Sequence, residues 1–486
     1  MTALAEKEAG IQTPMQAGGL KKNTYFIVIS QAVHLTLAFF LNIVAARTLG
    51  DEDFGKYNFA IVMSYFVFLF NDLGIVTYLT REVAQQKDRI EAYFLNSAVL
   101  KILLILASGI FLWMYLGVFS FPRDKVIVVL LFGVYGLFFS FNQLGFAAYR
   151  AMERMEYEMI VLIFEKTVIT SVSIYLLLQG YGILVFSVVF MCGGLLSMLL
   201  NLVLVKSKFL RKAATVDGAL MKTILKASFL LGIFWFLANI HERVDVMMLT
   251  VMKGDAVVGW YSAAYKIILV CAVIPNIVMT VTLPRISSAS RKDEGEVSKI
   301  YRLGLKYLFY LAVPMVVGTL FLADDMVVFL FGEQYMPGAD ALRVLIFAVG
   351  FDFFNVFFAV FLIAWNRKRS LALLQTGALL LNIVLNGVLI PSYAHVGAAT
   401  ASVVSKVLLF GVAFVLVYRR LGRPEFGPLL KGIAAALVMV LFLSYVHVHV
   451  FVSIGLAVMI YLLVLFIIGG IRPDEILVFK RSSSNA

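Results

Sequence analysis

Charged residues are scarce in this chain. Of its 486 residues, 14% are charged and 62% are hydrophobic, whereas an ordinary soluble domain has about 25% charged residues and roughly 45 to 50% apolar ones. The aromatic share is also high, at 14%. This composition excludes a water-soluble globular protein and indicates a chain whose outer surface faces lipid.

Cysteine is nearly absent. The two cysteines, Cys192 and Cys271, both lie within apolar runs, so neither a disulfide framework nor a cysteine-based metal site is expected. The sequence has no P-loop, no G-x-S-x-G motif and no H-E-x-x-H motif, and no hydrophilic segment is long enough to form a catalytic domain. We therefore predict no catalytic residues, no metal site and no cofactor.

Long apolar runs occupy most of the sequence. A membrane-spanning helix needs roughly 20 residues to cross about 30 Å of hydrocarbon. Because the runs are continuous rather than alternating, they predict helices and not a barrel. The fourteen predicted spans are 23–46, 57–79, 95–118, 126–148, 158–178, 181–205, 222–249, 257–280, 301–322, 341–364, 370–390, 396–418, 428–449 and 451–470.

Lysine and arginine fall mainly into alternate loops between these runs. Of the 41 such residues, 29 lie on one side of the predicted spans, 6 on the other side and 6 within them. By the positive-inside rule, the rich side is cytoplasmic. We therefore predict a multi-pass protein of the cytoplasmic (inner) membrane with both termini in the cytoplasm. This topology accounts for the net charge of +12, so no nucleic-acid partner is expected.

An internal repeat relates the two halves of the chain. Residues 50–57 (GDEDFGKY) share Gly, Asp, Gly and Tyr with residues 254–261 (GDAVVGWY), and each segment lies between the first two helices of a six-helix block. A second match relates residues 182–189 to residues 397–404. An even number of helices per block gives both blocks the same orientation, which is a parallel repeat.

The predicted fold is therefore an all-α polytopic membrane protein with 14 transmembrane helices. Two six-helix lobes are related by the parallel repeat, and two C-terminal helices follow them. The predicted parts are a disordered cytoplasmic tail at 1–22, an N-lobe with helices 1 to 6 at 23–212, a C-lobe with helices 7 to 12 at 213–423, and helices 13 and 14 with a cytoplasmic tail at 424–486.

Apart from charges near the span ends, which are counted with the adjoining loops, eleven charged residues lie inside the predicted spans. Each of them is costly there unless it faces a partner or water. They are Asp72, Glu165, Glu242, Asp245, Asp352, Lys101, Lys166, Arg243, Lys266, Lys306 and Lys406. Two interpretations stay open for each of them: pairing that only fixes helix packing, with snorkelling for lysines near helix ends, or a position in a hydrated cavity. As a set, the eleven charges favour a water-filled cavity between the halves.

The candidate site residues follow from this interpretation. We expect the substrate cavity to contain Lys266, Lys406, Arg243, Asp352, Asn355, Gln31, His34 and Asn42, and the candidates for ion coupling are Asp245, Glu242, His241 and Asp72. A buried Asp245 must be paired with a cation such as Lys266 or Lys406, or carry a proton. Gln375, Asn382 and Asn386 share a helix face and are expected to form interhelical hydrogen bonds.

Several short motifs resemble those of the oligosaccharide flippases of polysaccharide synthesis. These flippases form the polysaccharide transporter branch of a superfamily that also contains multidrug and toxin extruders and lipid II flippases. The resemblance covers nearly the whole chain and depends on the order of the motifs and on the repeat. The motifs are residues 47–57 (RTLGDEDFGKY), 71–74 (NDLG), 81–82 (RE), Asp245, 258–261 (VGWY), 283–284 (LP) and 331–335 (FGEQY).

The resemblance implies two six-helix lobes that alternate between inward and outward openings while they carry a polyprenyl-diphosphate-linked glycan across the membrane. Cationic residues would hold the diphosphate and sugar, the lipid tail would stay among the membrane lipids, and acidic residues would couple proton or sodium flow. A glycan polymerase and glycosyltransferases of the same pathway are the implied protein partners.

Two other functions stay open. An ion-coupled multidrug or toxin extruder has the same architecture, but a cavity for hydrophobic cations would contain few lysines, and here Lys266 and Lys406 accompany Asp245 and Asp352. A membrane glycan polymerase usually resembles a many-helix bundle with one large external loop. The longest external loop predicted here, near residues 323–340, has under about twenty residues. Transport is therefore favoured over catalysis.

Overall fold

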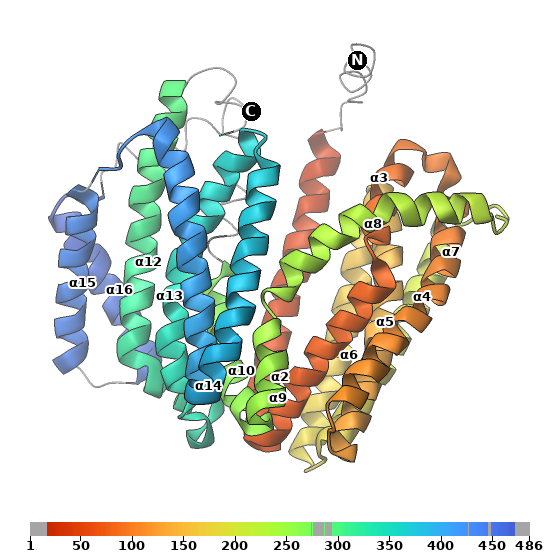
Figure 1. Ribbon diagram of the computed structural model, residues 1–486, viewed down its shortest axis with the longest axis horizontal. Helices are drawn as coiled ribbons and strands as arrows, with labels where there is room; N and C mark the ends of the chain where they lie inside the picture. Colours follow the sequence, from red (N-terminus) through yellow and green to blue (C-terminus); the bar gives the residue numbers. More distant parts are fainter. Residues whose placement is uncertain are drawn as a thin grey trace. The chain divides into compact units, whose positions relative to one another are not determined.

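The computed structural model describes residues 17–273, 275, 286, 294–425, 427–445 and 449–471, and within these residues every regular element is a helix (Figure 1). Residues 1–16 of the predicted N-terminal tail and residues 472–486 of the predicted C-terminal tail lie outside this part of the chain. The first helix begins at Ala17, six residues before the predicted start of the first span.

The first half of the chain forms α2 (Ala17–Asp72), α3 (Ile75–Gln85), η1 (Lys87–Arg89), α4 (Ile90–Val118), α5 (Arg123–Ala151), α6 (Met155–Leu178), α7 (Ile183–Lys208) and α8 (Gly218–Ile240). The second half forms α9 (Val244–Lys253), α10 (Asp255–Cys271), α12 (Glu294–Phe331), η2 (Glu333–Tyr335), α13 (Gly338–Ala364), α14 (Lys368–Leu421), α15 (Gly427–Tyr445) and α16 (Val450–Ile467).

The prediction of fourteen passes is confirmed. Ten of the described helices are long and apolar enough to cross a membrane. Two of these, Tyr25–Asp72 and Arg369–Leu421, have 48 and 53 residues, about twice the length that the hydrocarbon requires. Each is kinked near its middle, at Gly50 and at Ala394, so each makes two passes. The pair α8 and α9 makes one further pass, and α10 begins the other.

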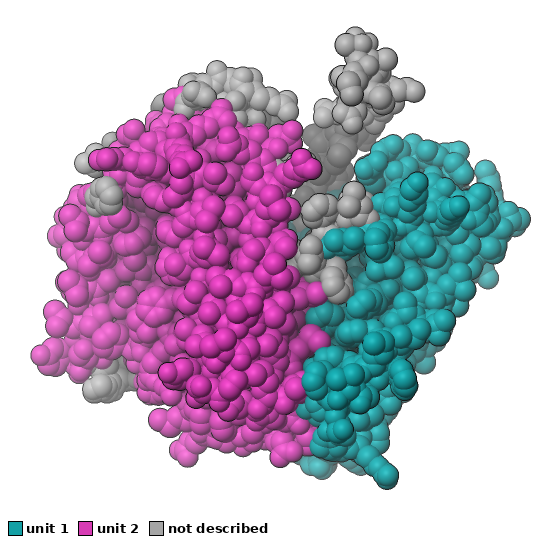
Figure 2. Space-filling model, in the orientation of Figure 1, with its two compact units in different colours: residues 1–48, 60–236 teal, residues 49–59, 237–486 magenta. Residues whose placement is uncertain are grey.

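The chain divides into two compact units (Figure 2). Residues 1–48 and 60–236 form the first unit, and residues 49–59 and 237–486 form the second. By packing, α8 therefore belongs to the first unit as far as residue 236, although the sequence repeat assigns this helix to the second lobe. Likewise, the segment that follows Gly50 packs within the second unit.

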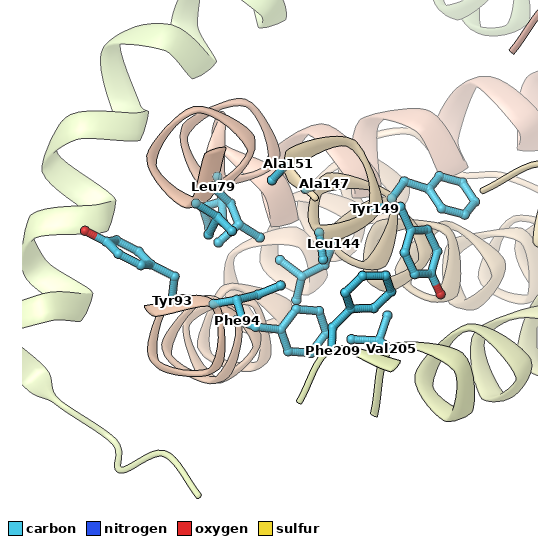
Figure 3. Close-up of a cluster of buried hydrophobic side chains, with 14 of the residues drawn as sticks. Leu79, Tyr93, Phe94, Leu144, Ala147, Tyr149, Ala151, Val205 and Phe209 are labelled. Atoms are coloured by element: carbon cyan, nitrogen blue, oxygen red, sulfur yellow. The ribbon is translucent and has the colours of Figure 1, made fainter. Parts of the chain in front are cut away.

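The core of the first unit is aromatic and aliphatic. Figure 3 shows Leu79 of α3, Phe94 of α4, Leu144 and Tyr149 of α5, and Phe209 just after α7 pointing into one cluster. Tyr149 is fully buried and donates a hydrogen bond of 2.7 Å to Asn201 Oδ1 of α7, which satisfies its phenol inside the cluster. This core joins residues of α3, α4, α5, α6, α7 and α8.

The two predicted C-terminal helices are an addition to the second unit. α15 and α16 pack on α12 through small and aromatic side chains, including Ala435, Ala436 and Tyr461. Small residues let helices approach closely in a membrane, where lipid gives no hydrophobic drive for association. Gly432 of α15 shows this, because a Cβ there would lie 2.8 Å from Phe309 of α12.

In the second unit, the two copies of the predicted repeat contact each other where their helices begin, just after Gly50 and just after Gly254. Gly50 has φ 81° and ψ 172°, and Gly254 has φ 85° and ψ −177°, a region that L side chains rarely adopt. A Cβ on Gly55 would lie 1.8 Å from the carbonyl oxygen of Asp255, and a Cβ on Gly259 would lie 2.1 Å from that of Asp51. The repeated glycines therefore permit the two repeated segments to touch backbone to backbone.

Two predicted spans are broken rather than continuous. In the span predicted at 57–79, Leu73 and Gly74 have positive φ angles of 42° and 82°, and Asp72 accepts hydrogen bonds from the amides of Gly74 and Val76 at 3.1 and 3.3 Å. In the span predicted at 222–249, residues 241–243 form a turn between α8 and α9. The long apolar runs around each break led to the prediction of a continuous span, although polar residues mark both breaks: Asn71 and Asp72 at the first, and residues 241–243 at the second.

Candidate functional site

A buried carboxylate with neutral partners lies in the second unit. Asp245, in the first turn of α9, is 3% exposed. It accepts hydrogen bonds from Tyr261 Oη of α10 at 2.7 Å, from Asn386 Nδ2 of α14 at 2.6 Å and from Ser402 Oγ of α14 at 2.6 Å. Each of these donors is uncharged, whereas Lys406 and His241 act on the carboxylate only through longer-range electrostatics.

Amide groups extend this cluster. Asn382 Oδ1 accepts a hydrogen bond of 3.0 Å from Asn386 Nδ2, and Asn382 and Asn386 are both fully buried. Asn386 Oδ1 is buried without a hydrogen-bond partner among the described residues. Carboxylate, amide and hydroxyl oxygens are the ligands that a hard cation prefers, and a lone buried carboxylate is also a natural proton acceptor. We call Asp245, Tyr261, Asn382, Asn386 and Ser402 the Asp245 cluster.

Sequence reasoning identified only part of the Asp245 cluster. It selected Asp245, and it expected Asn382 and Asn386 to form interhelical hydrogen bonds, which they do. It did not connect the two observations, because Asp245 and Asn386 are 141 residues apart. Ser402 and Tyr261 were missed as site residues, although both lie in the repeated segments at 397–404 and 254–261. The four-residue spacing of Asn382 and Asn386 was the available signal.

An ion pair occupies the neighbouring region of the same unit. Lys406 of α14 pairs with Asp352 of α13 at 2.5 Å, and both side chains are partly exposed. Asn355 Nδ2 also donates to the carbonyl oxygen of Lys406 at 3.2 Å. The structure therefore places Asp352, Asn355 and Lys406 together, as expected for the cavity. Lys406 forms its ion pair with Asp352 and not with Asp245.

The turn between α8 and α9 brings further charges close to this ion pair. His241, Glu242 and Arg243 form the turn, and His241 is within electrostatic range of Asp245, Asp352 and Lys406. Lys266 of α10 is half-buried, and Arg243 is its charged neighbour. The predicted site residues of the second unit thus gather around the N-terminus of α9.

The predicted intramembrane charges of the first unit form two closed networks. In the first, Lys101 is fully buried and donates to Asp72 Oδ1 and to Ser140 Oγ, each at 2.7 Å. Ser140 in turn donates to Asn71 Oδ1 at 2.7 Å, and Asn71 Nδ2 donates to the carbonyl oxygen of Lys101 at 2.8 Å. Asp72 is therefore both a helix cap and a paired core residue, which fits the packing interpretation.

The second network surrounds Glu165. Lys166 pairs with it at 2.8 Å, and Tyr135, Ser197 and Asn142 donate to it at 2.9, 3.0 and 3.3 Å. His34 of α2 is within electrostatic range of both members of the pair. Because every oxygen of Glu165 has donors, this network also fits a structural role, with His34 at its edge.

The remaining candidates of the first unit are not brought together by side-chain bonds. Gln31 is exposed, and Asn42 donates to the carbonyl oxygen of Ala38 in its own helix at 2.6 Å. Within the described residues no group of three or more His, Cys, Asp or Glu side chains is placed to hold a metal ion. The Asp245 cluster contains a single carboxylate and is not such a group.

Known proteins are similar to this chain in sequence. The family model described as "Polysaccharide biosynthesis protein" matches residues 20–290. A capsular polysaccharide biosynthesis protein, CapF, of Staphylococcus aureus is 21% identical over 420 residues, which are 82% of this chain and 99% of that protein. A putative O-antigen transporter of Shigella flexneri is 24% identical over 401 residues, which are 77% of this chain and 92% of that protein.

Solved structures share the fold. The lipid II flippase MurJ in an inward closed conformation has a TM-score of 0.76 and 18% identity, over 91% of this chain and 97% of that one. A multidrug resistance transporter of the MATE family in an inward-facing conformation has a TM-score of 0.61 and 14% identity, over 81% of this chain and 98% of that one. With more than half of its length matched by the family model, the chain belongs to the polysaccharide biosynthesis protein family of multi-pass membrane proteins.

Proposed function

We propose that this protein is a flippase that moves polyprenyl-diphosphate-linked oligosaccharide repeat units across the cytoplasmic membrane by alternating access. The observation that carries the proposal is the gathering of Arg243, Lys266, Asp352 and Lys406 around the start of α9 in a lipid-embedded helical bundle. Charges of both signs within the membrane suit a polar headgroup far better than an apolar drug. The family and the names of the relatives support the same function.

In this proposal, the diphosphate binds to cations of the second unit. Lys266 forms no ion pair with any described residue, so its ammonium is available to an anionic ligand. Lys406 is held by Asp352 at 2.5 Å and would donate to a phosphate from a fixed position. Asn355 beside it supplies an amide for sugar hydroxyl groups.

Ion coupling is assigned to the Asp245 cluster. A carboxylate surrounded by neutral donors gains or loses a cation without breaking an ion pair, which the paired Asp72 and Glu165 cannot do. Binding of a proton or a sodium ion there would change the hydrogen bonds that join α9, α10 and α14. The coupling ion would in this way alter the packing of three helices of the second unit.

An ion-coupled extruder is the second candidate, and the MATE-family structures favour it at the level of the fold. Deletion of the gene separates the candidates. A flippase predicts lipid-linked oligosaccharide that accumulates in the cytoplasmic leaflet, loss of surface glycan and unchanged sensitivity to cationic dyes. Dye hypersensitivity with normal surface glycan would instead identify an extruder. Single repeat units that reach the surface but are never joined would identify a polymerase.

Topology gives an independent prediction. In a background with Cys192 and Cys271 replaced by serine, single cysteines at Arg211 and Arg420 should stay protected from an impermeant thiol reagent in intact cells, whereas one at Lys253 should react. All three side chains are exposed, so burial does not confound the result. Labelling at Arg211 or Arg420 in intact cells would contradict cytoplasmic termini.

A further inference from the structure

A large cavity lies in the second unit, apart from the residues proposed for transport. Its volume is about 1300 Å³, above the roughly 300 to 1000 Å³ of a typical small-molecule site. It is lined by α12, α13, the second half of α14 and the start of α15, which are neighbouring helices (Figure 1). Neither the Asp245 cluster nor the pair of Asp352 and Lys406 is among its lining residues.

The inner wall of this cavity is aromatic. Phe410 of α14 is its centre, with ring centroids 5.3 Å from Phe351, 5.8 Å from Phe358 and 5.8 Å from Phe414. Phe309 and Phe354 complete the wall. Six phenylalanine side chains offer no hydrogen bonds, so this wall suits the hydrocarbon part of a ligand.

The mouth of the cavity is cationic. One face of α12 carries Lys299, Arg302 and Lys306, which are spaced about one turn apart. Lys431 of α15 also lines the cavity. Among the described lining residues the single carboxylate is Glu425, which lies 3.4 Å from Arg302 in an exposed ion pair. The mouth therefore carries excess positive charge next to an apolar wall.

We propose that this cavity binds an anionic glycerophospholipid of the cytoplasmic leaflet, with its phosphate at Lys299, Arg302 and Lys306 and its acyl chains on the phenylalanine wall. Basic pockets between membrane helices on the cytoplasmic side suit anionic headgroups. The leaflet assignment rests on the proposed topology, in which the start of α12 is cytoplasmic. A zwitterionic lipid places a compensating ammonium among the same cations and binds less well.

Native mass spectrometry of the purified full-length protein tests the proposal by titration with phosphatidylglycerol or phosphatidylcholine of the same acyl chains. Phosphatidylglycerol should bind more tightly. The triple variant K299Q/R302Q/K306Q should bind it about a hundredfold more weakly, since each basic group near an anionic headgroup contributes severalfold. The matched control K206Q/K208Q/R211Q removes three exposed cations of the first unit and should bind it normally.

Glu425→Gln gives a change of the opposite sign. This side chain is 64% exposed, so the substitution should leave the fold intact, and loss of the carboxylate should tighten phosphatidylglycerol binding severalfold. Inorganic phosphate should not displace the lipid, because it lacks hydrocarbon. Equal binding of the two phospholipids, equal loss in the control variant, or tighter binding of undecaprenyl phosphate than of phosphatidylglycerol would overturn the assignment.

Discussion

Replacement of Asp245 by asparagine should reduce glycan export at least about tenfold, the scale of a typical coupling free energy, while protein remains in the membrane at near-normal amounts. The substitution keeps the size of the side chain and removes its ability to hold a proton or a cation. Its three neutral donors, Tyr261, Asn386 and Ser402, tolerate a neutral oxygen acceptor, so folding should survive. Surface glycan and membrane protein level are measured in the same cells.

Asp88→Asn is the matched control, because Asp88 is exposed in η1, and it should export normally. The coupling ion is identified with purified protein. If sodium binds, sodium chloride should raise the melting temperature relative to choline chloride, and the rise should vanish in D245N and shrink in N386A and S402A. If a proton couples transport, melting should not respond to sodium. Normal export by D245N, or loss of export only in proportion to lost protein, would show that Asp245 is structural.

Replacement of Gly259 by alanine should destabilise the protein by about 3 kcal/mol or more, near the upper end of the range for overpacking. The new Cβ would lie 2.1 Å from the carbonyl oxygen of Asp51, a backbone atom that cannot rotate away. The helix starts at Gly50 and Gly254 would have to separate, with loss of the 2.9 Å hydrogen bond from Trp260 Nε1 to Asp51 Oδ2. Thermal melting of the purified protein measures the effect.

Gly55→Ala should have a comparable effect, and the double variant should cost less than the sum of the two, since one separation of the helices relieves both clashes. Gly109 and Gly411 provide controls, because no heavy atom lies within 4 Å of a Cβ built on either. Alanine there should leave the melting temperature unchanged or raise it slightly, as expected for a helix. If G259A melted at the same temperature as the two control variants, the two segments would not be in backbone contact.

At the contact between the two repeated segments, the sequence predicted more of the structure than it did in most of the molecule. The alignment of residues 50–57 with 254–261 identified Gly55 and Gly259 as equivalent, and the two positions make equivalent backbone contacts. Two positions can be aligned in a repeat without knowing how far apart they lie in the folded protein. That the two copies touch each other was not predictable, because nothing local to either segment encodes its partner.

The pairing of the intramembrane charges, in contrast, could not be predicted from the sequence. The expected choice for Asp245 was a cation such as Lys266 or Lys406, or a proton. The structure pairs Lys406 with Asp352 and surrounds Asp245 with neutral donors. The sequence showed which residues are charged and lie in apolar runs, but the partner of each depends on which helices face each other. These contacts join residues 16 to 157 positions apart.

The sequence by itself determined that this is an all-helical membrane protein of fourteen passes with a repeated half, because the thickness of the bilayer imposes helix length on each segment separately. Only the tertiary structure decided that the helices break at Gly74 and at residues 241–243, that Asp72 and Lys101 satisfy each other, and that Asp245 meets Asn386 and Ser402. These outcomes depend on close approach between distant segments. In lipid the hydrophobic effect does not drive helices together, so specific packing and hydrogen bonds determine which segments come into contact.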